Sequence, residues 1–225
     1  MTRAVFFDVD FTLIHPGPAF QGNGYRDFCA RHGISVDPAL FAQSVASAST
    51  LLDSSGGIYD PQIFIDYTRR IIEGMGGSGD RVDRAARDIY DEWSACHHFT
   101  LYEDVPDVVR ELHARGLTIG LISNTQRCLA SFQAHFALDG LFAVAVSSAA
   151  HGYMKPHPSI FQSALEQARA SVEESVMVGD SLDHDIAGAL RLGMRAVLVA
   201  RSGTPVDCPP DVPVITTLRD LPSLI

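Results

Sequence analysis

Five short apolar runs recur along the chain without the alternation of a half-buried strand. They are AVFF (4–7), LTIGLIS (117–123), LFAVAVSS (141–148), SVMVGD (175–180) and MRAVLVA (194–200). Runs rich in Val, Ile, Leu and Phe are typical of strands that are covered on both faces in a parallel sheet. The pattern therefore predicts five buried parallel strands.

Helical patterns lie between the later runs. Residues 104–116 repeat apolar side chains at helical spacing and end in Gly116, a residue that favours helix termination. The segments 157–169 and 183–193 follow the same plan. Alternating strands and helices predict an α/β fold with a doubly wound, Rossmann-like parallel sheet.

A long segment without a convincing strand interrupts this alternation after the first run. Loops between a strand and a helix usually span about two to six residues, so a gap of roughly ninety requires its own structure. We predict a Rossmann-like core from residues 1–15 and 99–225, and an inserted helical domain over 16–98. Its expected helices cover 25–33, 38–53, 61–75 and 80–96.

Composition narrows the possible partners. The formal net charge of −10 argues against a nucleic-acid or anionic-membrane surface, because both attract basic patches. No stretch approaches the roughly 20 apolar residues of a membrane span. The N-terminal apolar run is too short for a signal peptide, and the four cysteines are scattered. We therefore expect a cytoplasmic protein, either a monomer or a homodimer.

Polar residues gather after the predicted strands, where doubly wound sheets bind their ligands. They are Asp8, Asp10, Ser123, Asn124, Lys155, Asp180 and Asp185. Two unit charges about 4 Å apart interact by about 4 kcal/mol at an effective dielectric constant near 20, so four acids repel strongly. One lysine does not offset that repulsion, whereas a divalent cation does. Oxygen ligands alone favour a hard ion, Mg²⁺ first.

Four segments carry a family resemblance in their order and spacing. DVDFT (8–12), SNT (123–125), KPHPSIF (155–161) and GDSLDHD (179–185) resemble the motifs of the haloacid dehalogenase-like hydrolase superfamily. The inserted helices resemble that superfamily's helical cap of the first type. A cap implies a small substrate, because closure excludes water and bulky chains. One departure is Phe11, where many members have glycine.

The resemblance implies catalytic roles for three residues. Asp8 would be the nucleophile that forms an aspartyl-phosphate. Asp10 would be the general acid for the leaving alcohol and then the base for the hydrolytic water. Lys155 would neutralise charge on Asp8 and on the phosphoryl oxygens.

The resemblance also implies supporting roles. Thr12 and Ser123 would orient the nucleophile and the phosphate, and the Asn124 backbone amide would add a phosphate contact. Mg²⁺ would be held by the remaining implied ligands: the Asp8 carboxylate, the Asp10 main-chain carbonyl and Asp180. Asp185 would brace either the water shell of the ion or Lys155.

These roles imply a Mg²⁺-dependent phosphatase that acts on a small soluble phosphomonoester. Asp10 favours phosphate esters over haloacids, because an alkoxide needs a proton on leaving and a halide does not. A phosphotransferase or sugar-phosphate mutase uses the same motifs and stays open. So do a 2-haloacid dehalogenase and a non-enzymatic signalling or binding protein that is phosphorylated on aspartate.

Two adjacent histidines, His97 and His98, could also ligate a metal ion. Neighbouring side chains point apart on a regular strand or helix. The sequence therefore favours a hinge or surface role for this pair.

Overall fold

A computed structural model describes residues 1–53, 57–203 and 207–225. Contacts between Cα atoms divide the chain into two compact units. The first, the core unit, joins Met1–His15 to Leu101–Ile225, and the second, the inserted unit, comprises Pro16–Thr100. The chain therefore leaves the core unit after its first strand and returns to it before the remaining ones.

A six-stranded sheet forms the centre of the core unit, in the order β5-β4-β1-β6-β7-β8 with every pair parallel. The strands are β1 (Ala4–Phe7), β4 (Thr118–Ser123), β5 (Val144–Ser147), β6 (Ser175–Gly179), β7 (Arg195–Val199) and β8 (Val214–Ile215). The predicted α/β class and all five predicted strands are confirmed. The sequence pattern missed β8, since two residues are too short to show a pattern.

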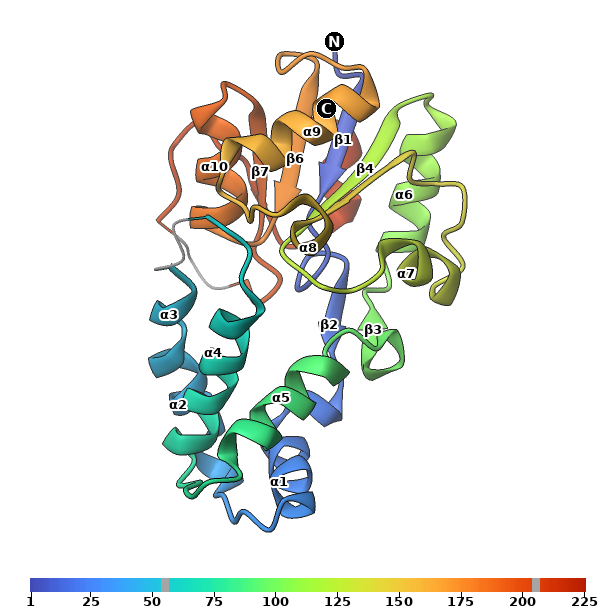
Figure 1. Cartoon of the computed structure of the whole chain (residues 1–225). Coiled ribbons are helices and arrows are strands. Elements are labelled where there is room, and N and C mark those ends of the chain that lie inside the picture. The colour runs from blue at the N-terminus through green and yellow to red at the C-terminus, as the bar shows by residue number, and fades with distance from the viewer. Residues whose placement is uncertain (54–56, 204–206) are drawn as a thin grey trace. The chain divides into compact units, whose positions relative to one another are not determined.

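Helices cover both faces of this sheet. They are α6 (Val105–Ala114), α7 (Leu129–His135), α8 (Ser148–His151), α9 (Pro158–Ala168), the π-helical turn η4 (Leu182–Ile186), α10 (Ala187–Arg191) and the 3₁₀ segment η5 (Leu218–Ser223). Apolar residues of α9 and α10 share one buried cluster with Phe6 and Met177, and α9 lies in front of β1 and β6 in Figure 1. Alternation along β1 turns Val5 and Phe7 to the opposite face.

Strand register fixes where the functional residues emerge. Phe7 at the end of β1 pairs with Leu121 of β4 on one side and with Val178 of β6 on the other. The chain order thus reverses direction across the sheet at β1, which is the point where doubly wound sheets bind ligands. Asp8 is the next residue after β1, so it lies at this edge of the sheet, beyond the carboxyl ends of the strands.

The regular elements in the described part of the inserted unit are helices, apart from strand residues at its two ends. Its elements are η1 (Pro18–Phe20), α1 (Gly22–Arg31), η2 (Pro38–Leu40), α2 (Phe41–Ala48), α3 (Thr50–Asp53), α4 (Pro61–Gly74), α5 (Val82–Glu92) and η3 (Cys96–His98). Two short strands, β2 (Ile14–Pro16) and β3 (Phe99–Leu101), pair where the chain passes between the units.

One predicted helical segment of this unit is divided. Residues 38–53 form three short elements instead of one. The Asp37 side chain accepts a hydrogen bond from Ala39 N–H, so a tight capped turn precedes α2. The Ser49 hydroxyl donates to the Ala46 carbonyl between α2 and α3. Such local bonds compete with a continuous helix, and hydrophobic spacing does not reveal them.

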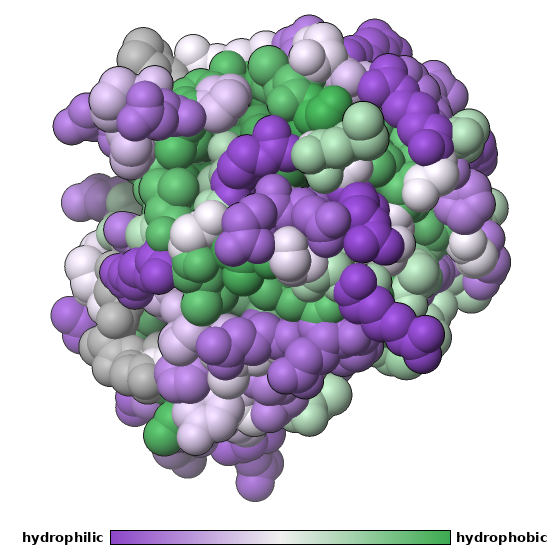
Figure 2. Space-filling view, turned by 90° about the horizontal axis from the view of Figure 1, so that it is seen from above, coloured by the Kyte–Doolittle hydropathy of each residue, from purple (hydrophilic) through white to green (hydrophobic). Residues whose placement is uncertain are grey.

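The surface mixes polar and apolar residues. Figure 2 shows hydrophilic residues in a band across hydrophobic ones on the face seen from above. The exposed large apolar side chains are scattered along the sequence, from Met1 and Phe11 to Leu224. No described helix combines the length and the apolarity needed to cross a bilayer. Oligomeric state stays a prediction.

Candidate active site

Asp8 lies directly beyond β1 and is almost fully buried. Its N–H donates to the Val178 carbonyl over 2.9 Å, which continues the ladder between β1 and β6 and fixes the backbone. Lys155 Nζ donates a hydrogen bond to Asp8 Oδ1 at 2.5 Å. A carboxylate buried to this extent needs such a partner.

Lys155 is 3% exposed, and three oxygen atoms surround its ammonium group. Nζ lies 2.5 Å from Asp8 Oδ1, 2.6 Å from Asp185 Oδ1 and 2.8 Å from the Ile122 carbonyl oxygen. Burial by itself lowers the pKa of Lys155, but the charges of Asp185 and Asp8 outweigh it and raise the pKa above its usual value. The lysine is therefore a permanent cation.

Asn124 sets the position of Lys155 along the chain. The Asn124 Oδ1 atom accepts from Lys155 N–H at 2.7 Å, and Asn124 Nδ2 donates to the Lys155 carbonyl at 2.9 Å. This pair of hydrogen bonds joins the loop after β4 to the loop that carries the lysine. The side chain of Asn124 thus positions Lys155, a role that the sequence analysis did not give it.

Asp185 reaches Lys155 because Gly179 leaves room. The Asp185 Oδ2 atom also accepts from Ser181 N–H at 3.1 Å. A Cβ atom built on Gly179 would fall far inside van der Waals contact with Asp185 Oδ2. Of the two roles predicted for Asp185, this arrangement supplies the contact with Lys155.

Asp180 completes a group of three carboxylates with Asp8 and Asp185. One oxygen from each lies within 4.8 Å of the other two. The Thr12 hydroxyl donates to Asp180 Oδ1 at 3.3 Å. Burial and the neighbouring carboxylates raise the pKa of Asp8 to about 6 and that of Asp180 to about 8, although Lys155 opposes both shifts. The protein by itself therefore holds an excess of negative charge here.

Ser123 ends β4 at the same edge of the sheet. Its hydroxyl is buried and finds no hydrogen-bond partner among the residues that the structure describes. A buried polar atom without a partner is costly in a native protein. The hydroxyl is thus available to a bound molecule.

Asp10 forms an ion pair with Arg127 that the sequence analysis did not predict. Arg127 Nη1 lies 3.0 Å from Asp10 Oδ1 and 3.1 Å from Oδ2, and the Arg127 side chain is fully buried. Burial raises the pKa of Asp10, and the guanidinium charge limits that rise. The Thr125 hydroxyl oxygen accepts from Arg127 N–H at 3.0 Å. Arg127 was missed because it lies just beyond the recognised SNT motif.

A second buried pair supports the turn that holds Thr12. Arg201 donates to Asp104 Oδ2 at 2.6 Å and to the Thr12 carbonyl at 2.7 Å. Burial raises the pKa of Asp104, but hydrogen bonds from Arg201, Thr217 and Leu218 outweigh it and lower the pKa. Neither residue belongs to a motif, so no sequence pattern indicates the pair.

Phe11 adopts a backbone conformation that favours glycine. Its φ angle is +65°, in the left-handed region, and its N–H donates to the Ile14 carbonyl at 2.7 Å. A left-handed residue with a Cβ costs about 1–2 kcal/mol, which glycine avoids. The Phe11 ring is exposed.

A family model for haloacid dehalogenase-like hydrolases matches residues 2–193. The chain belongs to this family. The family match covers β1, β4, β5 and β6 together with Asp8, Lys155 and Asp180, and it confirms that the protein is a hydrolase.

Individual relatives agree with this assignment. The human haloacid dehalogenase-like hydrolase domain-containing protein 3 is 28% identical over 88% of this chain and 81% of its own. The pyrophosphatase PpaX of Bacillus cereus is 36% identical over 49% of this chain and 53% of its own. A 2-haloacid dehalogenase from Pseudomonas syringae has a similar structure, with a TM-score of 0.66 and 26% identity over 100% of this chain and 98% of its own. Hydrolases of both phosphate and carbon–halogen type thus resemble the chain.

Proposed function

We propose that the protein is a Mg²⁺-dependent phosphatase that hydrolyses a small soluble phosphomonoester through an aspartyl-phosphate. The observation that carries this proposal is the placement of Asp8, a buried carboxylate at the switch point of the sheet, against Lys155 Nζ at 2.5 Å. The relative PpaX, named a pyrophosphatase, supports phosphorus–oxygen chemistry in this part of the family.

The donor set fits magnesium. Asp8 and Asp180 would ligate the ion through carboxylate oxygens and Asp10 through its main-chain carbonyl, and all three ligands are hard oxygen donors. Burial first, and then the neighbouring carboxylates, raise the pKa values of Asp8 and Asp180, and a bound cation would offset both effects. When bound, the ion would supply positive charge that stabilises the phosphoryl oxygens.

In the first step, Asp8 would attack phosphorus. A bond forms between an Asp8 carboxylate oxygen and phosphorus, and the bond from phosphorus to the leaving alcohol oxygen breaks. Asp10 would give its proton to that oxygen. Lys155, the Ser123 hydroxyl and the Asn124 backbone amide would hold the phosphoryl oxygens.

In the second step, Asp10 would act as a base. It takes a proton from water as the water oxygen attacks phosphorus, and the bond from Asp8 to phosphorus breaks. Inorganic phosphate leaves, and Asp8 returns as a carboxylate. Arg127 would hold the Asp10 carboxylate in place between the two steps, since it contacts both carboxylate oxygens.

The presence of Asp10 favours this reaction over dehalogenation. An alkoxide requires a proton when it leaves, and a halide does not. A half-buried carboxylate with a raised pKa is equipped to supply that proton. A phosphotransferase or sugar-phosphate mutase differs only in the acceptor of the phosphoryl group, and product analysis separates them. A stable phospho-Asp8 would instead favour a signalling protein.

Further parts of the proposal concern the whole chain. We propose that residues 1–15 and 99–225 form the catalytic core domain. Residues 16–98 would act as a helical cap that selects the substrate. We also propose a cytoplasmic protein, monomeric or homodimeric, without nucleic-acid or membrane partners. The net charge of −10 supports the last point, because it opposes binding to polyanions.

The direct test is Asp8→Asn assayed with an aryl phosphate. We expect turnover to fall to background while circular dichroism and thermal unfolding stay those of a folded protein. Asp183→Asn is the matched control, since Asp183 is an exposed aspartate in the same motif as Asp180. EDTA should silence the wild type, and added Mg²⁺ should restore it. Full activity of Asp8→Asn would overturn the nucleophile assignment.

A further inference from the structure

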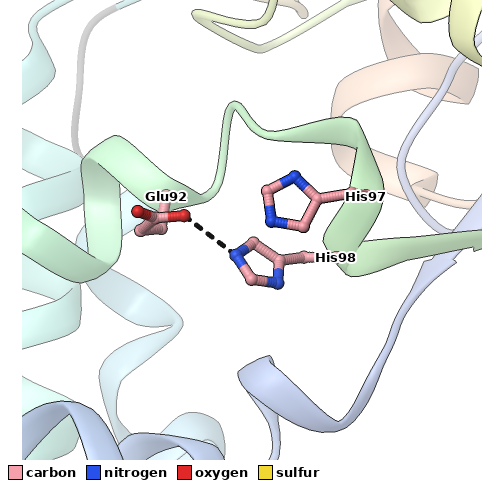
Figure 3. A group of neighbouring side chains, drawn as sticks. All are labelled: Glu92, His97 and His98. Carbon is pink, nitrogen blue, oxygen red and sulfur yellow. Dashed lines mark hydrogen bonds and ion pairs between the residues drawn. The ribbon is translucent and has the colours of Figure 1, made fainter.

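A second cluster of metal-ligating side chains lies in the inserted unit. Glu92 ends α5, and His97 and His98 follow it in η3 (Figure 3). One ligand atom from each residue lies within 4.8 Å of the other two. Among the described residues, two such clusters occur, and this one contains histidine.

The two histidines converge, so the expectation that they point apart is wrong. Their ring centroids lie 4.0 Å apart at an interplanar angle of 44°. The reason is local: residues 96–98 form a tight 3₁₀ turn, in which His98 N–H donates to the Ala95 carbonyl at 3.2 Å. Neighbouring side chains in such a turn do not follow the alternation of a strand.

Packing holds this arrangement in place. His98 Nε2 lies 2.8 Å from Glu92 Oε2, and the His98 ring meets Phe20 edge to face with centroids 5.3 Å apart. Figure 3 shows the His97 ring beside that of His98, with Glu92 facing both. His98 and Glu92 are half-buried and His97 is exposed. An ion could therefore enter from solvent and meet ligands that are already assembled.

We propose that Glu92, His97 and His98 bind a divalent transition-metal ion, Zn²⁺ first. Two imidazole nitrogens and one carboxylate oxygen are ligands of borderline softness, which suit zinc better than magnesium. The three acidic residues of the core unit offer oxygen alone. The chain thus carries two ligand sets of different preference.

The distance between His98 and Glu92 permits zinc binding with little movement of these two ligands. Ligand atoms about 2.0–2.1 Å from a tetrahedral zinc ion lie roughly 3.4 Å apart. His98 Nε2 and Glu92 Oε2 need to separate by about 0.6 Å from their 2.8 Å hydrogen bond. The ion takes the place of the shared proton, which leaves to solvent. A fourth position stays open to water.

Binding would tie the end of α5 to the turn that leads into β3. Residues 93–95 link these two elements along the chain, and the bond from His98 to Glu92 joins them across that link. A ligand that binds the folded form alone raises its stability. We therefore expect zinc to raise the unfolding temperature of the chain.

The test uses the full chain without a histidine tag, stripped of metal and kept in excess Mg²⁺. We expect calorimetric titration with Zn²⁺ to show one tight equivalent, and Co²⁺ to give the visible absorption of a site with nitrogen ligands. Zinc should also raise the midpoint of thermal unfolding. A wild type that binds no Zn²⁺ in the micromolar range would overturn the proposal.

Variants locate the ion. His97→Ala and Glu92→Gln should each weaken Zn²⁺ binding at least tenfold, and His97 is exposed, so its loss leaves the fold intact. His32→Ala is the matched control, because His32 also bonds a carboxylate of α5, Asp88, at 2.7 Å. It should keep wild-type affinity. Unchanged binding in His97→Ala, or binding lost in Asp180→Asn, would contradict the assignment.

Discussion

At the scale of single residues, the site depends on buried charges that have fixed partners. Asp8 pairs with Lys155, and Asp10 pairs with Arg127. Removing one member of a buried pair is costly, because the remaining charge has no compensation. Charge placement should therefore affect both the stability and the chemistry of the protein.

Arg127 provides the first prediction at this scale. Arg127→Met should lower kcat by about a hundredfold, the lower range of what a positioned acid–base group contributes. The loss should be larger for an alkyl phosphate than for an aryl phosphate, since only the poorer leaving group depends on the proton from Asp10. Steady-state kinetics with both substrates measure this ratio. An equal loss for both would contradict a role of Arg127 in the proton transfer to the leaving group.

Gly179 provides the second prediction at this scale. Gly179→Ala should lower the unfolding temperature and displace Asp185 from Lys155, because the new Cβ would overlap Asp185 Oδ2. In an Asp185→Gly background, the same glycine substitution should cost much less, as the whole obstructing side chain, its Cβ included, is gone. Denaturant titration of the four proteins in this double-mutant cycle gives the coupling. Additive effects would show that the clash is absent.

Sequence reasoning performed unevenly at this scale. Asp8, Lys155, Asp180 and Asp185 converge as the strand-end argument predicted, because parallel register brings these ends to one edge. The Arg127 contact with Asp10 and the Arg201 contact with Asp104 were not predictable. Each joins residues about a hundred positions apart through loop conformations that leave no periodic signal.

At the scale of elements, the strands could be predicted from the sequence because they are buried on both faces. Runs such as LTIGLIS contain almost only apolar residues, and few structures besides a buried strand produce so short and apolar a run between helical segments. The helices of the inserted unit were predicted less accurately. Two side-chain hydrogen bonds divide residues 38–53: Asp37 accepts from Ala39 N–H, and the Ser49 hydroxyl donates to the Ala46 carbonyl. Hydrophobic spacing does not reveal them.

At the scale of the whole molecule, stability should depend on pH and magnesium together. The pKa values of Asp8 and Asp180, about 6 and about 8 when folded, lie above their usual value of 3.8. The folded protein thus binds more protons than the unfolded chain. The protonated Asp8 and Asp180 carboxyl groups thus contribute to the free energy of unfolding. This contribution is full below about pH 4 and is lost as pH rises through 6 and 8.

The metal-free protein should therefore lose thermal stability between pH 5 and pH 9. Mg²⁺ bound to these carboxylates would compete with the protons, so the stabilisation by Mg²⁺ should grow over the same interval. Thermal scans with EDTA and with Mg²⁺ measure both curves, and Asp180→Asn should flatten them. A stabilisation by Mg²⁺ that is equal at pH 5 and pH 9 would contradict the account.

The central claim is that Asp8 carries the phosphoryl group during turnover. The most direct measurement is mass spectrometry of the enzyme quenched in acid within the first turnovers of an aryl phosphate, followed by digestion. We predict one added phosphoryl group on the peptide with Asp8, absent with EDTA and absent in Asp8→Asn. Phosphate release at full rate with no modified peptide, or with the group on another residue, would contradict it.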